Sequence, residues 1–175
     1  MAQSSPANRI AILRAAESDL PAIATLAGVI WRAGYRDIIS SEQIDYMLDR
    51  MYALDTLRRE IQHEGIRYDR LLVDGQFIGF AAFGPAGPAA TFKLHKLYLH
   101  PDVQGRGFGS ALLKHCEAEA LQAGARQLIL NVNKRNTRAI AVYQTNGFRI
   151  IEPVVVDIGG GFVMDDYVMS KELHS

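Results

Sequence analysis

The chain has 175 residues, of which 49% are hydrophobic and 22% are charged, and its 19 basic residues balance 19 acidic ones. This composition is typical of a soluble globular protein, and a neutral chain has no overall field that would draw it to nucleic acid or to an anionic membrane. The single cysteine, Cys116, excludes an intrachain disulfide and a cysteine-rich zinc site, so no metal site is predicted.

The stretch MAQSSPANRI at the start of the sequence lacks the charged residues and apolar core of a signal peptide. No apolar run approaches the roughly 20 residues of a membrane helix. We therefore expect a cytoplasmic protein. The length suits a sizeable core, and because no linker divides the sequence, we assign residues 1–175 to a single domain.

The N-terminal part of the chain predicts a strand followed by two helices. The strand covers residues 9–16 (RIAILRAA), and Ser18 and Asp19 supply cap chemistry for the first helix. The second helix starts in SSEQIDYMLDRMY, where Ser40 and Gln43 fit a capping box.

The middle of the chain predicts a third helix, over roughly residues 54–63, and then three strands. Two of them form a hairpin, because the apolar runs of RLLVDGQFIGFAAF flank Asp74 and Gly75, a pair that tolerates the left-handed positions of a tight turn. The third strand, TFKLHKLYLH, ends before Pro101.

The C-terminal part predicts two helices and three more strands. One helix opens after a glycine-rich segment and closes at Gly124, and the buried strand RQLILNV follows. The second helix begins at Asn136 and ends at Gly147, and a long hairpin then turns at residues 159–161. The whole order, β-α-α-α-β-β-β-α-β-α-β-β, predicts an α/β protein with a mixed sheet and helices on its faces.

Three glycines, Gly105, Gly107 and Gly109, lie between a predicted strand and a predicted helix. The first amides of a helix have no internal partner and carry the positive end of its dipole, and glycine lets an anion approach them closely. The segment therefore predicts an anion-binding turn. The dinucleotide fingerprint Gly-x-Gly-x-x-Gly fails, because Ser110 or Leu112 stands at its last position, and no Gly-Lys-Ser/Thr follows.

Two motifs lie in this half of the chain. One is Gln-x-x-Gly-x-Gly, formed by Gln104, Gly107 and Gly109. The other is Asn-x-x-Ala-x-x-x-Tyr followed by Gly-Phe, formed by Asn136, Ala139, Tyr143, Gly147 and Phe148. Together they resemble the signatures of the GNAT superfamily of acyl-CoA-dependent N-acetyltransferases. The resemblance implies a GNAT-like fold, a central mixed seven-stranded sheet flanked by four to five helices, with strands 4 and 5 splayed apart.

The resemblance also implies that acetyl-CoA is the co-substrate. Backbone amides of the loop would surround its pyrophosphate, and the backbone of Leu97 and Leu99 would lie beside its pantetheine and thioester, which Asn136 would also meet. Arg106 either adds positive charge or is a solvated loop residue. The implied cofactor-binding residues of the loop are Gln104, Gly105, Arg106, Gly107, Phe108, Gly109 and Ser110.

Transfer of an acetyl group to an amine needs a polarised carbonyl and an acid for the departing thiolate. The backbone amide of Leu97 is the candidate for the first role. Tyr143 is the candidate acid, because a phenol keeps its proton at neutral pH, and it also belongs to the implied coenzyme A contacts. The alternative for Tyr143 is a buried residue that packs its helix onto the sheet.

A base must also remove a proton from the acceptor ammonium group. His95 is the candidate, because it shares strand parity with Leu97 and Leu99 and its reference pKa suits base work. A core histidine and a water relay remain alternatives. The neighbouring Lys93 and Lys96 should lower the pKa of His95.

The acceptor end is predicted from residues that break local rules. Asp165 and Asp166 lie inside a strand pattern, where aspartate is disfavoured, and one of them faces each side of the sheet. Either could hold a cationic amine, or the pair guards an edge strand. Trp31 and Tyr35, one helical turn apart, either wall the acceptor pocket, as the resemblance implies, or are core residues.

The leading hypothesis is an N-acetyltransferase that moves the acetyl group of acetyl-CoA to a primary amine of a small molecule by direct attack in a ternary complex. A non-catalytic acyl-CoA-binding module and a protein-amine acetyltransferase are the alternatives. A nucleotide-binding regulator is disfavoured by the failed fingerprints. We expect no metal, nucleic-acid or membrane partner, and a homodimer is left open.

Overall fold

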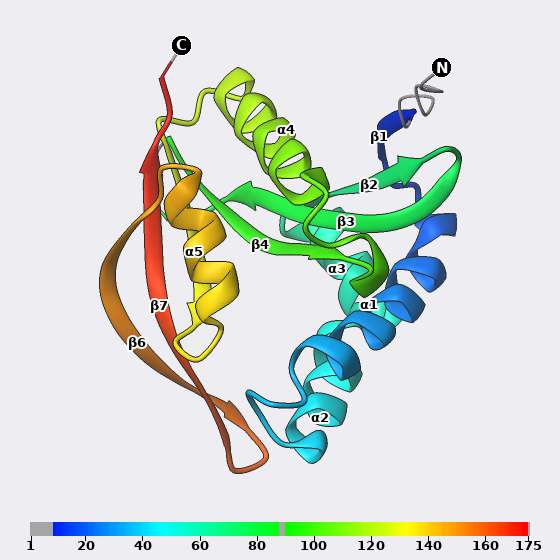
Figure 1. Ribbon diagram of the computed structural model, residues 1–175, viewed down its shortest axis with the longest axis vertical. Helices are drawn as coiled ribbons and strands as arrows, with labels where there is room; N and C mark the ends of the chain where they lie inside the picture. The colour runs from blue at the N-terminus through cyan, green and yellow to red at the C-terminus, as the bar shows by residue number, and fades with distance from the viewer. Residues whose placement is uncertain (1–8, 88–89, 175) are drawn as a thin grey trace, which may run out of the picture.

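The computed structural model describes residues 9–87 and 90–174, which form a seven-stranded mixed sheet with helices on both faces (Figure 1). The strand order is β1-β2-β3-β4-β5-β7-β6, in which β4 and β5 run parallel and the other neighbours are antiparallel. The strands are β1 (Ile10–Arg14), β2 (Arg67–Val73), β3 (Gln76–Pro85), β4 (Thr91–Leu99), β5 (Gln127–Asn133), β6 (Arg149–Gly159) and β7 (Phe162–Glu172).

Five α-helices join these strands, together with short 3-10 turns at Glu17–Asp19 and Pro101–Val103. None of the helices in the described ranges combines the length and the apolar composition needed to cross a bilayer. The predicted element order and the mixed α/β sheet are confirmed. The helices are α1 (Leu20–Gly34), α2 (Ser41–Met51), α3 (Leu54–His63), α4 (Phe108–Gln122) and α5 (Thr137–Thr145).

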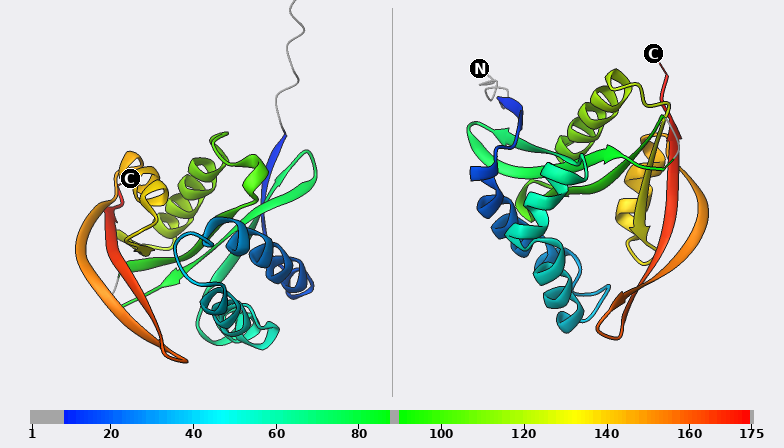
Figure 2. Two further views of the ribbon diagram at one scale, coloured as in Figure 1. Left: turned by 60° about the horizontal axis from the view of Figure 1, so that its bottom comes forward. Right: turned by 180° about the vertical axis from the view of Figure 1, so that it is seen from behind.

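The sheet separates two hydrophobic clusters. Beneath α4 and α5, residues such as Leu112 and Leu128 are fully buried against one face. On the opposite face lie α1, α2 and α3 (Figure 2). These helices enclose the second cluster, which contains Trp31 and Phe80. Any site between strands is therefore approached by α4 and α5 from one side and by α1 to α3 from the other.

The helix starts agree with the sequence in position but not in every contact. Ser40 Oγ accepts a hydrogen bond from Gln43 N at 3.1 Å, as predicted. The capping box is incomplete, because Gln43 Nε2 donates to Val163 O at 2.8 Å instead. Asp19 stands at the N-cap of α1 without a side-chain bond to that helix, but its carboxylate caps the preceding 3-10 turn by accepting from Ala16 N at 2.8 Å and also pairs with Arg70 at 2.9 Å. A distant partner thus replaces the local contact at Gln43, whereas Asp19 keeps a local capping role.

A buried group of charged residues fastens α4 to β2. Asp69 on β2 is 0% exposed, and its carboxylate accepts from Arg67 Nε at 2.7 Å and lies 2.6 Å from His115 Nε2 on α4. Arg67 also pairs with Glu119 on α4. Each charge in the group has a partner of opposite or complementary character, which is the condition for burying charge without a large penalty.

The strand β4 carries the irregularity that creates the site. It pairs with β5 only from Thr91 to Leu94, and beyond this point the two strands part, as the resemblance implied. On its other edge, the register with β3 jumps between Leu94 and Lys96, which leaves His95 as the extra residue of a β-bulge. A bulge breaks the alternation of side chains between the two faces of the sheet.

Candidate active site

The edge of β4 that faces β5 is unpaired after Leu94. On the opposite edge, His100 N donates to Ile78 O of β3 at 2.8 Å. Because alternate residues of an antiparallel strand bond to the same neighbour, the N–H groups of Leu97 and Leu99 point away from β3, toward the splayed end of β4 and β5. The side chains of both leucines pack into the cluster beneath α4, so only their backbone is available to a ligand.

A run of free backbone amides follows β4. Within the described chain, no amide from Gly105 to Ser110 donates a hydrogen bond. Gly105 and Gly107 have φ values of 80° and 84°, and a Cβ built on either one meets no atom within 4 Å. The helix α4 begins directly after Gly107 and adds the positive end of its dipole. These features form an open turn suited to a phosphate.

Two polar side chains of this turn hold it in place. Gln104 Nε2 donates to Leu99 O at 3.3 Å, which ties the loop to the end of β4. Ser110 Oγ accepts from Asn146 Nδ2 at 3.3 Å, which ties the start of α4 to the end of α5. Asn146 was not singled out by sequence analysis, because the contact joins two helices that only the fold brings together.

The remaining residues of the turn divide between core and surface. Phe108 is 4% exposed and belongs to the cluster beneath α4, so only its backbone can meet a ligand. Arg106 is exposed, and its guanidinium carbon lies 5.2 Å from the centre of the Phe108 ring. Gly109 lies close to Leu99, whose Cδ1 would be 3.3 Å from an added Cβ, so this glycine serves packing.

Asn136 and Tyr143 both belong to α5. Asn136 is its N-cap, and its Oδ1 accepts from Ala139 N at 3.2 Å, while its side chain also lies close enough to Tyr35 to lower the pKa of that residue. The ring of Tyr143 packs edge-on against Phe148, with centroids 5.7 Å apart. Burial, and then the neighbouring Tyr35, raise the pKa of Tyr143, so its hydroxyl keeps its proton well above neutral pH.

Tyr35 lies between the core beneath α1 to α3 and the residues beside the splayed strands. Its ring stacks on Trp31 with centroids 4.5 Å apart, and Trp31 is 1% exposed. Trp31 is therefore a core residue, the second of its two predicted roles, and it supports Tyr35 from behind. Burial raises the pKa of Tyr35, and the polar groups of Tyr98 on β4 and of Asn136 at the N-cap of α5 oppose that rise. Tyr35 is the aromatic residue of this pair that reaches the splayed strands.

The predicted parity of His95 with Leu97 and Leu99 is wrong. The bulge turns His95 to the face covered by α1 to α3, where its Nε2 is buried without a hydrogen-bond partner in the described chain. Burial, followed by Lys93 and Lys96, lowers the pKa of His95 to about 4, while Glu64 opposes the shift. The expected direction of the lysine effect is confirmed, and the result is a weak base at neutral pH.

The two neighbouring aspartates of β7 face opposite sides of the sheet, as predicted. Asp165 is exposed and forms an ion pair with Lys134. Asp166 is 6% exposed, and its Oδ1 has no hydrogen-bond partner among the described residues. Burial and then Asp165 raise the pKa of Asp166 to about 6, against the opposing effect of Lys93 and Lys134. Asp166 is thus the member that faces the interior of the site.

The β6–β7 hairpin reaches across to α2 (Figure 1). Tyr46 Oη donates to Ile158 O at 2.8 Å. A Cβ built at Gly159 would lie 2.6 Å from Tyr46 Oη, and one at Gly160 would lie 2.7 Å from its Cε2. The triglycine turn therefore permits a close approach to the Tyr46 ring, and the hairpin is docked against α2 on the face of the sheet that α1 to α3 cover.

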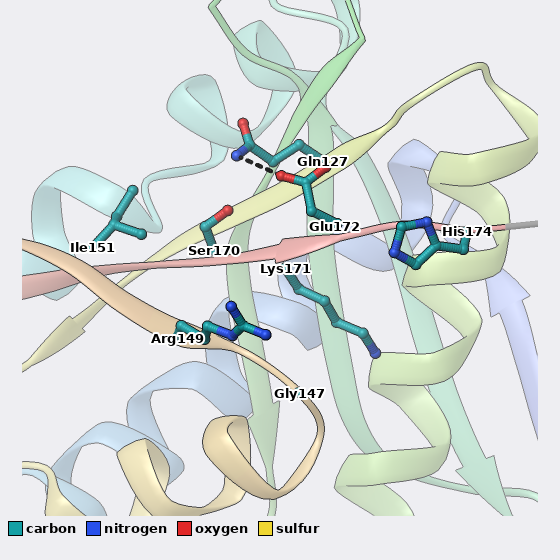
Figure 3. Close-up of a pocket in the computed structure, with 8 residues that line it drawn as sticks. All are labelled: Gln127, Gly147, Arg149, Ile151, Ser170, Lys171, Glu172 and His174. Carbon is teal, nitrogen blue, oxygen red and sulfur yellow. Dashed lines mark hydrogen bonds between the residues drawn. The ribbon is translucent and has the colours of Figure 1, made fainter.

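A separate hollow of about 460 Å³ lies at the other ends of β5 and β7 (Figure 3). Its polar side chains are largely satisfied: Gln127 Nε2 donates to Glu172 at 3.4 Å, and Lys171 pairs with Glu117 on α4 at 2.7 Å. None of the predicted site residues lines it. In the part of the chain that the structure describes, no three His, Cys, Asp or Glu side chains gather as a metal ion would require.

The comparisons with known proteins agree with this geometry. The sequence profile of the Acetyltransferase (GNAT) family matches residues 31–148. An uncharacterized N-acetyltransferase of Mycobacterium tuberculosis is 36% identical over 100 residues, which cover 57% of this chain and 63% of that protein, so the match spans less than two thirds of the relative. A spermidine N(1)-acetyltransferase of Thermoplasma acidophilum is 27% identical over 95% of this chain and 99% of its own. The crystal structure of a PaiA N-acetyltransferase from Thermoplasma acidophilum in complex with coenzyme A has a TM-score of 0.79 at 25% identity, covering 94% and 99% of the two chains.

Proposed function

Because the chain belongs to the acetyltransferase (GNAT) family, we propose that it is an enzyme that transfers the acetyl group of acetyl-CoA to a primary amine of a small molecule. The transfer is a direct attack within a ternary complex. The one cysteine is not available for an acetyl-enzyme intermediate, because Cys116 is 0% exposed and burial raises the pKa of its thiol.

The run of free amides from Gly105 to Ser110 is the observation that carries this proposal. It offers hydrogen-bond donors to the pyrophosphate of acetyl-CoA, and the bare backbone of Gly105 and Gly107 leaves room for the phosphates. The free edge of β4 would receive the pantetheine arm. The coenzyme A bound to the PaiA protein of Thermoplasma acidophilum supports the same co-substrate.

The chemistry assigned to the chain needs three groups around a thioester that acetyl-CoA supplies. As the amine nitrogen bonds to the carbonyl carbon and the C–S bond breaks, the N–H of Leu97 stabilises the charge on the carbonyl oxygen, a contribution of about 3 kcal/mol for one such donor. The Tyr143 hydroxyl gives its proton to the departing sulfur. A third group must take the proton that the acceptor ammonium loses.

We assign that third role to Asp166 rather than to His95. Its pKa of about 6 lies nearer to the working range of a base than the pKa of about 4 of His95. Its carboxylate also attracts the ammonium form of the acceptor before the proton is removed. The unpartnered Oδ1 of Asp166 supports a role with a ligand, since buried polar atoms in proteins are nearly always hydrogen-bonded.

A small-molecule acceptor is supported by the spermidine N(1)-acetyltransferase of Thermoplasma acidophilum, which aligns along almost the whole chain. The test combines binding and turnover. Calorimetry measures coenzyme A affinity, and release of free thiol measures acetyl transfer to a panel of small amines and of peptides with free N-termini. Thiol release driven by small amines is expected. Coenzyme A binding without turnover of any amine would identify the non-catalytic module, and faster turnover of peptides would identify a protein-amine enzyme.

The binding step is tested separately with Gly107→Val. A branched side chain at this position would fill the space left for the phosphates, and we expect calorimetry to detect no coenzyme A binding. Gly124→Val is the matched control, because Gly124 has a similar φ of 91° and equally open surroundings but lies at the far end of α4. Unchanged coenzyme A affinity in Gly107→Val would remove the loop from the proposal.

A further inference from the structure

Lys93 on β4 and Asp166 on β7 share the face of the sheet that α1 to α3 partly cover. The residues that follow them in sequence, Leu94 and Tyr167, point to the opposite face and pack beneath α4 and α5. On β5, which runs between these strands, Asn133 stands opposite Asp166. Lys93 pairs with Ile129 in the joined part of β4 and β5, and Asp166 lies further along this face, opposite Asn133, so the two side chains flank the point where the strands part.

The charges of Lys93 and Asp166 act on each other without forming an ion pair. Burial lowers the pKa of Lys93, and Asp166 opposes that shift. Lys93 has the reciprocal effect on Asp166. Among the described residues, neither side chain has an ion-pair or hydrogen-bond partner in the protein, and Asp166 Oδ1 is buried. Two opposite charges thus lie on one face of the sheet, near enough to act on each other but without a direct contact.

The other ionised groups of this region have partners. Lys134 pairs with Asp165, Lys96 pairs with Glu60 at 2.7 Å, and Glu64 pairs with Arg59 at 2.9 Å. His95 is uncharged at neutral pH. The guanidinium of Arg135, which follows β5, donates to the backbone carbonyls of Ile38 and Asp37. Lys93 and Asp166 are the charged groups of this region that have no partner among the described residues.

From this arrangement we propose that the acceptor is an amine that also carries a carboxylate, an amino acid or a related zwitterion, with Asp166 holding its ammonium group and Lys93 its carboxylate. The inference rests on the proposed acetyl transfer and narrows its acceptor. Lys93 is the specificity-determining residue, because it binds a part of the substrate that does not react.

A polyamine fits these charges poorly. After its first ammonium group is held by Asp166, its second would have to find another free carboxylate, and the carboxylates of Asp165, Glu60 and Glu64 are already paired. It would also meet the ammonium of Lys93. A carboxylate at that position instead forms a charge-assisted contact, worth roughly 10- to 100-fold in binding for a hydrogen bond to a charged group.

The test compares matched probes in the wild-type enzyme. The acids are L-leucine, L-phenylalanine, β-alanine and 4-aminobutyrate, the controls are the carboxamides of the same four compounds, and spermidine and putrescine represent polyamines. We expect kcat/KM for the best acid to exceed that of its carboxamide by roughly 10- to 100-fold. A polyamine with a higher kcat/KM than every acid would overturn the inference and leave the acetyl transfer intact.

Two substitutions then test whether Lys93 causes the preference for an acid over its carboxamide. Lys93→Met keeps the length of the side chain and removes its charge, so the acid-over-carboxamide ratio should fall to about one. Lys93→Arg should retain most of the ratio. Lys114→Met is the matched control, because Lys114 is an exposed lysine on α4. An unchanged ratio in Lys93→Met would show that Lys93 does not bind the carboxylate.

A binding measurement separates this inference from the proposed activity. The one tryptophan of the chain, Trp31, stacks on Tyr35, so its fluorescence reports on occupancy beside Asp166. With coenzyme A present, the acids should change this fluorescence at lower concentration than their carboxamides, and Lys93→Met should abolish the difference. This result without any turnover would refute the acetyl transfer and keep the zwitterion site. Equal titrations of acids and carboxamides would refute the site.

Discussion

Two buried aspartates of the same sheet have opposite surroundings. Asp69, beneath α4, is 0% exposed and is held by Arg67 at 2.7 Å and His115 at 2.6 Å. Asp166, at the splayed strands, is 6% exposed and leaves Oδ1 without a partner among the described residues. Removing one member of a fully partnered buried charge group is strongly destabilising, whereas a buried charge without a partner is retained against its cost.

The same contrast holds for buried tyrosines. Tyr68, on the face covered by α3, is hydrogen-bonded to Glu60 and to Lys96, and both partners are themselves buried or half-buried. Tyr143 has no hydrogen-bond partner for its hydroxyl in the part of the chain that the structure describes, although burial strongly favours its protonated form. Asp166 and Tyr143, the two unpaired members of these comparisons, lie on opposite faces of the sheet beside the strands that part.

The largest expected effect is on stability and concerns Asp69, the fully paired aspartate. Asp69→Ala would leave Arg67 and His115 without their buried carboxylate and should lower the free energy of unfolding by about 3–5 kcal/mol. Urea unfolding followed by circular dichroism measures it. The control is Asp165→Ala, which breaks an exposed pair with Lys134 and should cost no more than about 1 kcal/mol. Equal losses in the two variants would show that the burial of Asp69 carries no special weight.

The next effect is on catalysis rather than on stability. Tyr143→Phe removes an unpaired hydroxyl but keeps the ring against Phe148, so the fold should be unaffected. We expect kcat to fall by about 100-fold, a usual size for loss of one general acid, while acetyl-CoA affinity stays the same. Full activity of the variant between pH 6 and pH 9 would leave Tyr143 as a packing residue.

How far the sequence predicts each region depends on the kind of signal. The turn at Gly105 and Gly107 and the hairpin at Asp74 and Gly75 were predictable, because a positive φ strongly favours glycine, or Asp and Asn, wherever it occurs. The order of helices and strands was also predictable, because the spacing of apolar residues along the chain is a local signal. The open turn of the candidate site belongs to this predictable part.

The side chains around the splayed strands were less predictable. The parity rule failed at His95, because a bulge adds one residue to β4 and depends on the pairing with β3. The side chain of Gln43 left its predicted cap for the carbonyl of Val163, and Arg135 donates to Asp37 O at 2.9 Å in the α1–α2 loop. Such contacts join segments that are distant in sequence, and no local pattern encodes them.

A smaller effect, of opposite sign in stability, is expected for Asp166→Asn. The folded pKa of about 6 lies above the reference value of 3.8, so the folded protein holds the Asp166 proton more tightly than the unfolded chain does. The free energy of unfolding therefore falls as pH rises from about 4 to about 6. The Asn variant avoids this loss and should be more stable than wild type by about 1–2 kcal/mol at pH 7.5, with the difference vanishing near pH 4. Urea unfolding at several pH values measures the trend.

The same variant should be a poorer enzyme. In wild type, kcat/KM for the acceptor should rise with pH through about 6 as Asp166 becomes a carboxylate, and the Asn variant should lack this limb and have a raised acceptor KM. The KM for acetyl-CoA should not change. A variant that is less stable and fully active would remove the contrast between Asp166 and Asp69.

The smallest catalytic effect is expected for His95→Gln, which sharpens the comparison because His95 is another buried group on this face without a hydrogen-bond partner among the described residues. Burial and the two flanking lysines keep the imidazole neutral, with a pKa of about 4 against a reference value of 6.5. Stability linked to His95 is therefore present above pH 6.5 and lost as pH falls toward 4, the reverse of Asp166. The Gln variant should be more stable than wild type by about 1 kcal/mol at pH 5 and no more stable at pH 7.5.

The kcat of His95→Gln should stay within about threefold of wild type. The rise of kcat/KM with pH near 6 should be preserved, because the base is Asp166. Loss of that rise in His95→Gln, and its survival in Asp166→Asn, would reverse the two assignments.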